Sequence, residues 1–158
     1  MGAEQSQQLP EITVPLSYDE PPYVSNLTQV AMTNKAFRRV LRTDGNQQLV
    51  VMSLPPFGQI GYEAGHPVTT QTTLNITGHG YVQIGRRKLP FNPGDIAVIP
   101  RGTAHNVVNT SDETMSIAII YSPPHHPPAI EESLPASTEF DLYDQNQRRR
   151  RRRRRRFV

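Results

Sequence analysis

The sequence predicts an all-β domain, a sandwich or a barrel, and three observations support this fold class. Short apolar runs of strand length recur between residues 37 and 121, and turn residues separate them. No segment of this region keeps helical periodicity for three turns. The length of 158 residues suits one domain of ordinary size and leaves no room for a second full domain.

The N-terminal segment is predicted to be an extended arm, which we assign to residues 1–29. Up to Asn26 it consists of Gln, Glu, Ser and Pro with isolated apolar residues, and no period of 2 or 3.6 persists in it. Ile12, Val14 and Leu16 alternate with polar residues, a pattern compatible with an added strand at a sheet edge.

The barrel domain is assigned to residues 30–132 and contains seven predicted strands. These are Phe37–Leu41, Leu49–Leu54, Thr70–Ile76, Tyr81–Ile84, Ile96–Ile99, Val107–Val108 and Met115–Tyr121. The connections carry turn chemistry, as in Asp44-Gly45-Asn46 and Asn92-Pro93-Gly94. The strands and turns together predict a closed or sandwiched β-structure.

A proline-rich segment follows the last predicted strand and holds the pair His125 and His126. Prolines at this density are not expected within a sheet, so we expect the segment to pass over the end of the barrel as polyproline II. Paired histidines in such a loop are more often unligated than metal-bound. Residues 133–147 are predicted to be a loose linker to the C-terminus.

Composition excludes several kinds of site. With no cysteine there is no disulfide, no thiolate zinc site and no cysteine nucleophile, so a metal would need histidine, carboxylate or amide ligands. No apolar run approaches the roughly 20 residues that span a bilayer, and the N-terminus does not resemble a signal peptide. We therefore expect an intracellular protein.

A spaced motif near the C-terminal end of the barrel carries the strongest functional signal. It runs from Gly94 through Pro100, Gly102 and His105 to Asn109, without a gap. This pattern resembles the second sequence motif of the cupin superfamily, and the resemblance implies a double-stranded β-helix, or jelly-roll barrel. In that fold the histidine that matches His105 faces the interior.

An altered version of the cupins' first motif precedes it. Gly58, His66 and Gly78 stand at the matching positions, but Ala64 replaces the first histidine and Gln71 replaces the glutamate. The frame is therefore kept, while two of the four ligand-type positions of the two motifs together differ.

A branch of small single-domain cupins, often described as resembling mannose-6-phosphate isomerase, is more similar over about residues 33–132. The residues that resemble it include the runs around Phe37–Leu41 and Tyr121–Pro128. That branch implies the ligand set Glu63, His66, Gln71 and His105 for Fe, Mn, Ni or Zn. Barrels of this kind usually pair, which implies a homodimer.

The position of Glu63 leaves two alternatives open. In the branch the glutamate stands two residues before the first histidine, whereas Glu63 stands three before His66. A β-bulge at Gly65 would absorb the extra residue and turn Glu63 inward. Without it Ala64 would occupy the ligand position, and the barrel would hold metal weakly or not at all. No catalytic residue is assigned, and a small polar molecule is the expected ligand of the barrel.

The C-terminal segment 148–158 is dominated by nine consecutive arginines. Without these nine, eight basic side chains stand against fourteen acidic ones, and the formal charge of the rest is −6. Such a run requires a polyanionic partner, most readily nucleic acid. The predicted polyanion-binding residues are Arg148, Arg149, Arg150, Arg151, Arg152, Arg153, Arg154, Arg155 and Arg156.

Three functions compete at this point. The first is a metal-binding cupin tethered to an anionic surface by its arginine run. The second is a metal-poor cupin used as a structural or packaging component of a virion or nucleoprotein particle. The arginine run favours such a particle, or the nucleus, as the location of the protein. The third is a peripheral membrane protein acylated at Gly2, because the first six residues fit the myristoylation pattern.

Overall fold

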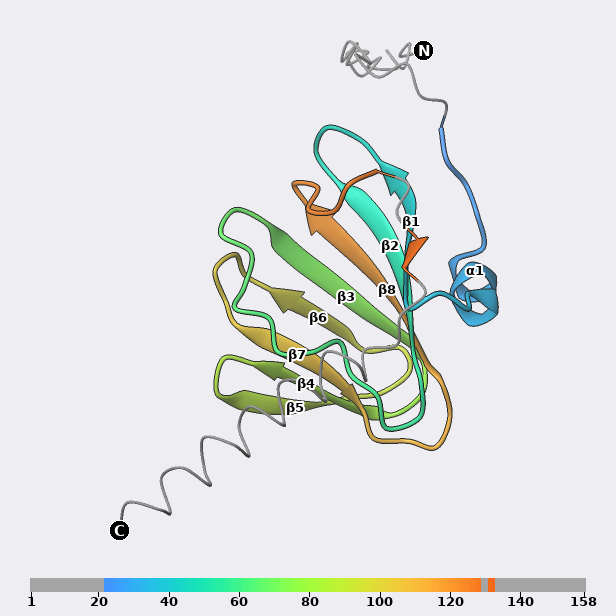
Figure 1. The fold of residues 1–158 in the computed structure, drawn as a ribbon, viewed down its shortest axis with the longest axis vertical. Coiled ribbons are helices and arrows are strands. Elements are labelled where there is room, and N and C mark those ends of the chain that lie inside the picture. The colour runs from blue at the N-terminus through green and yellow to red at the C-terminus, as the bar shows by residue number, and fades with distance from the viewer. Residues whose placement is uncertain (1–21, 129–130, 133–158) are drawn as a thin grey trace, which may run out of the picture.

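The computed structural model describes residues 22–128 and 131–132, which form two antiparallel sheets and one short helix (Figure 1). The elements are α1 (Leu27–Thr33), β1 (Arg38–Thr43), β2 (Gln48–Leu54), β3 (Thr70–Thr77), β4 (Gly80–Ile84), β5 (Arg87–Phe91), β6 (Ile96–Ile99), β7 (His105–Asn109), β8 (Met115–Ser122) and β9 (Glu131–Glu132). Gly2, the alternating residues of the arm, the linker and the arginine run lie outside the described residues.

The larger sheet has six strands in the order β6-β3-β8-β2-β1-β9, and the smaller has three in the order β5-β4-β7. All the pairings recorded between these strands are antiparallel. Two isolated bridges, Gln59 with Val108 and Glu63 with His105, attach the segment between β2 and β3 to the smaller sheet. The all-β prediction is confirmed.

Each of the seven predicted strands is present, and two further strands were not predicted. β5 has four exposed residues out of five and includes Pro90, so its sequence lacks the alternation of a half-buried strand. It lies at an edge of its sheet, where proline is tolerated. β9 has only two residues and pairs with β1, Arg38 opposite Glu132.

The helix α1 was also not predicted, so the structure differs from the expected arm at residues 27–29. Asn26 caps the helix by accepting a hydrogen bond from the Gln29 amide at 3.0 Å. Ala31 packs against Val51 and Ala118 on the outer face of the larger sheet. Two turns are too short for helical periodicity to be recognised in the sequence.

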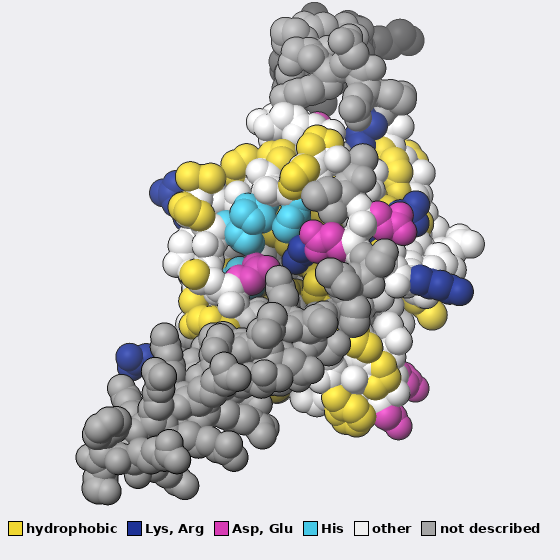
Figure 2. All heavy atoms as spheres, in the orientation of Figure 1, with side chains coloured by type: hydrophobic (Ala, Val, Ile, Leu, Met, Phe, Trp, Pro, Cys, Tyr) yellow, Lys and Arg dark blue, Asp and Glu magenta, His cyan; other side chains and the backbone are white. Residues whose placement is uncertain are grey.

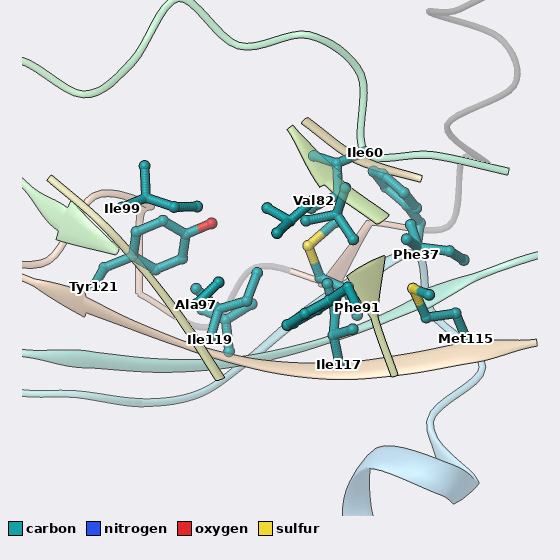
Figure 3. Packing of buried hydrophobic residues seen from close by; sticks show 14 residues of the cluster. Phe37, Ile60, Val82, Phe91, Ala97, Ile99, Met115, Ile117, Ile119 and Tyr121 are labelled. Atoms are coloured by element: carbon teal, nitrogen blue, oxygen red, sulfur yellow. The ribbon is translucent and has the colours of Figure 1, made fainter. Parts of the chain in front are cut away.

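An apolar core fills the space between the sheets (Figure 3). It includes Phe37, Phe91, Met115 and Ile117, and Tyr121 lies in the same cluster. Tyr121 also marks the place where the interior becomes polar, because it is the cross-strand partner of Gln71 and its ring lies 5.6 Å from that of His66. Gln71 and His66 thus lie beside the apolar core.

Candidate metal centre

Strand alternation and one backbone bridge position the site. Gln71 is the second residue of β3 and faces inward with Thr73 and Asn75, whereas the residues between them are only half-buried. His105 is the first residue of β7 and is fully buried. Glu63 is held opposite His105 by two backbone hydrogen bonds of 2.9 and 3.0 Å.

The backbone at Gly65 decides between the two alternatives for Glu63. Gly65 has φ +102°, a conformation that favours glycine, and it stands between exposed Ala64 and buried His66. The His66 carbonyl then accepts a 2.7 Å hydrogen bond from the Gly102 amide. Glu63 therefore faces the histidines, and Ala64 faces solvent.

Glu63, His66 and His105 converge on a common point. The Glu63 Oε2 atom lies 3.2 Å from Nε2 of His66 and 3.2 Å from Nε2 of His105. The ligand atoms of the three residues all lie within 4.8 Å of one another. Gln71 Oε1 joins them, 3.1 Å from His105 Nε2.

The surrounding hydrogen bonds fix which atom each residue presents. His105 Nδ1 lies 2.9 Å from the Thr103 carbonyl oxygen, which can only accept, so Nδ1 carries the proton of the neutral ring. Gln71 Nε2 donates to Thr73 Oγ1 at 3.1 Å, which directs Oε1 toward His105. A neutral His105 thus presents a lone pair toward two oxygen acceptors, and a cation is needed among them.

The electrostatics of the site agree with this geometry. Burial opposes ionisation of Glu63, but the hydrogen bond and charge of His105, with the charges of His66 and Arg38, outweigh it and lower the pKa of Glu63. Burial also opposes protonation of His105, yet Glu63 and the Thr103 carbonyl raise the pKa of His105. Without another cation, a proton on His105 would occupy the position between these acceptors.

The residues fit a divalent metal ion. His66 is 8% exposed, and although Glu63 Oε2 lies 3.2 Å from its Nε2 atom, that atom makes no well-oriented hydrogen bond among the described residues. Its pKa is lowered, first by burial, then by the nearby charges of His125 and His105, with Glu63 opposing, so the neutral, metal-binding form is favoured. Two imidazole nitrogens, one carboxylate and one amide oxygen suit Fe, Mn, Ni or Zn.

Several residues at the site were missed by sequence reasoning. The ring of His125 lies 3.7 Å from that of His66, and His126 packs on Tyr121 at 4.9 Å. Arg38 lies 3.8 Å from the second oxygen of Glu63. Figure 2 shows histidine side chains gathered beside acidic ones on one face of the molecule. The sequence predicted that the proline run passes over the end of the barrel, but not that its histidines pack against His66 and Tyr121.

The described residues include no helix that is long and apolar enough to cross a membrane.

Two known proteins and one family profile are similar in sequence to this chain. Residues 50–121 match the profile of a family described as the cupin domain. The uncharacterised protein YrkC of Bacillus subtilis (strain 168) is 34% identical over 116 residues, which are 70% of this chain and 62% of that protein. An uncharacterised protein of Acanthamoeba polyphaga mimivirus is 36% identical over 110 residues, 67% of this chain and 68% of that protein. This chain thus spans less than two thirds of YrkC.

Solved structures share the fold. The crystal structure of BH2720 from Bacillus halodurans has a TM-score of 0.69 and 33% identity, and the match covers 73% of this chain and 92% of that chain. A protein with a double-stranded β-helix domain from Klebsiella pneumoniae has a TM-score of 0.57 at 20% identity, covering 65% and 91% of the two chains. These matches confirm the predicted double-stranded β-helix.

Proposed function

The chain belongs to the cupin domain family, and from this premise we propose that its barrel binds a divalent transition metal and uses this centre to hold a small polar molecule. Glu63, His66, Gln71 and His105 are the proposed ligands. The observation that carries the proposal is the convergence of the Glu63 carboxylate on two imidazole nitrogens at 3.2 Å each.

The chain's own residues would prepare the centre for this role. Thr103 holds His105 in the tautomer that leaves Nε2 free, and Thr73 turns the Gln71 oxygen inward. Such a metal, when bound, supplies a Lewis acid that polarises a carbonyl or hydroxyl oxygen. The inward-facing hydroxyl of Thr73, beside Gln71, favours a polar ligand over an apolar one.

Elemental analysis of the purified protein and its variants tests the proposal. We expect about one equivalent of transition metal in the wild type, and loss of it in His66→Ala and in His105→Ala. His79→Ala is the matched control, because His79 is exposed and its ring contacts Asn92 at 3.2 Å in a turn. Equal metal content in all four proteins would contradict the proposed centre.

The arginine run favours a second function in the same chain. We propose that it binds nucleic acid, because each phosphate that an arginine neutralises releases condensed counter-ions with little dependence on sequence. The rest of the chain has a formal charge of −6 and should be repelled by phosphate. Binding should therefore belong to the run and not to the barrel.

Salt titrations of full-length protein and of a variant lacking residues 148–156 test this second function. The slope of log K against log salt should be about −5 to −8 on duplex DNA if most arginines engage, and the truncated protein should not bind. Binding that survives truncation, or that ignores salt, would refute the assignment. If the full-length protein binds DNA while its barrel holds no metal, the packaging role would be favoured.

A further inference from the structure

Arg38 is a half-buried cation beside the proposed metal centre, and its hydrogen-bonding capacity is incompletely used. It is the first residue of β1, and its side chain is 12% exposed. Its Nε atom is buried and has no hydrogen-bond partner in the described part of the chain. Because a guanidinium offers five N–H donors, Arg38 keeps a donor for a further acceptor.

The contacts of Arg38 show which kind of acceptor fits. Glu132 of β9 occupies the fork from outside, with its Oε2 atom 2.6 Å from Nη1. On the inner side Nη2 lies 3.8 Å from Glu63 Oε1, longer than a direct hydrogen bond. Arg38 therefore stands between an outer carboxylate and the carboxylate of the proposed metal centre.

Glu132 is the more replaceable of these two partners. Its side chain is 38% exposed, and the two residues of its strand pair with β1. Glu63, in contrast, is committed to both histidines through its other oxygen. Because the Glu132 carboxylate is partly exposed, another carboxylate can compete with it for the guanidinium.

The proline run is held in place by Gln48, the first residue of β2. The His126 backbone donates to Gln48 Oε1 at 2.9 Å, and its carbonyl accepts from Gln48 Nε2 at 2.8 Å. Gln48 is fully buried, so this reciprocal pair fixes the loop. The His126 Nε2 atom is buried without a described partner, and its ring packs on that of Tyr121 at 4.9 Å.

We propose that Arg38 binds the carboxylate of the barrel's small-molecule ligand through its unpartnered Nε donor, and that Glu132, which holds Nη1, competes for the same guanidinium. The inference rests on the proposed function, because the ligand would be held at two points, by its carboxylate at Arg38 and by a second oxygen at the metal centre. A planar monoanion suits the position better than phosphate, because Glu63 and Glu132 both lie at the guanidinium and repel a second negative charge.

The test uses full-length protein, zinc-loaded and zinc-free, at constant ionic strength. Glycolate is the probe, glycolamide its neutral counterpart and inorganic phosphate the second anion. Binding is followed by NMR at the Arg38 Nε–H resonance and at backbone amides of β1, which separates this site from anion binding elsewhere. We expect glycolate to bind at least about tenfold more tightly than glycolamide or phosphate.

Three variants decide the roles of the residues. Arg38→Gln should weaken glycolate binding at least about tenfold. Glu132→Gln should strengthen it severalfold because the competing charge is removed. Glu131→Gln, in the same strand but opposite Arg39, is the matched control and should leave it unchanged. If Arg38→Gln does not fold, the glycolate affinities of Glu132→Gln and Glu131→Gln still show whether glycolate binds at Arg38.

The outcomes separate this inference from the metal proposal. Unchanged glycolate affinity in Arg38→Gln and Glu132→Gln, with zinc content intact, would overturn the role of Arg38 alone. Equal or tighter binding of phosphate would overturn the carboxylate class. A wild type that holds no zinc would overturn the proposed function, and titration of the zinc-free protein would then decide the Arg38 inference by itself.

Discussion

Gly65 offers a direct test of how the backbone turns Glu63 into the barrel. At φ +102° a side chain is strained at this position. A Cβ atom on Gly65 would also lie 2.7 Å from the Thr103 nitrogen and 2.8 Å from the Gly102 carbonyl carbon. Both are backbone atoms, so they cannot rotate away as a flexible side chain would. Gly65→Ala must therefore move either its own segment or the turn that precedes His105.

The two costs set the expected magnitude. A non-glycine residue in a disfavoured backbone conformation costs about 1–3 kcal/mol, and overpacking costs about 1–3 kcal/mol more. We expect Gly65→Ala to lower the free energy of unfolding by about 2–6 kcal/mol. The control is Gly85→Ala, because Gly85 has φ +58° but a Cβ atom added to it would meet no heavy atom within 4 Å. It should lose only the conformational part, about 1–2 kcal/mol.

Urea unfolding of the metal-free proteins measures both losses, and titration with zinc measures the consequence for the site. Displacement of Glu63 should weaken zinc binding in Gly65→Ala, whereas Gly85→Ala should bind zinc as the wild type does. If the two variants lost equal stability and bound zinc equally, the close packing at Gly65 would not be what positions Glu63.

Three further predictions concern the core, the proline run and assembly. Ile117→Ala, at a fully buried core position, should cost about 2–5 kcal/mol in urea unfolding, whereas exposed Leu89→Ala should cost under about 1 kcal/mol; equal losses would contradict the described core. Burial, then the charges of Arg38 and His125, lower the pKa of His126 to about 4. Between pH 6.5 and 4 the unfolded chain therefore binds a proton at His126 that the folded chain excludes. As the pH is lowered through this range, the free energy of unfolding should decrease more steeply in the wild type than in His126→Asn, and parallel pH curves would refute this. The expected homodimer should give a dimeric mass in light scattering at micromolar concentration, and a monomeric mass would reject it.

Most of the barrel could be predicted because its strands show their burial in the sequence. Ile96–Ile99 alternates between exposed and buried residues, and its predicted bounds are those of β6. β5 could not be recognised, because four of its five residues are exposed at a sheet edge. The helix α1 is too short for its few apolar residues to establish a period.

The site was predictable where it depends on spacing within a motif and unpredictable where it depends on tertiary contact. His66, Gln71 and His105 followed from the resemblance, and the structure brings them together. The direction of Glu63 depended on the backbone conformation of Gly65, which the residue type permits but does not determine. Arg38 and Glu132 stand 94 residues apart and meet only because β9 pairs with β1.

The central claim is that Glu63, His66, Gln71 and His105 hold one metal ion, and X-ray absorption of the zinc-loaded protein tests it most directly. We expect four light-atom ligands, with two imidazole nitrogens at about 2.0–2.1 Å from the zinc and the remaining ligands oxygen. In His105→Ala, zinc that is still bound should show no more than one imidazole. A wild-type spectrum without imidazole ligands, or one that His105→Ala leaves unchanged, would contradict the claim.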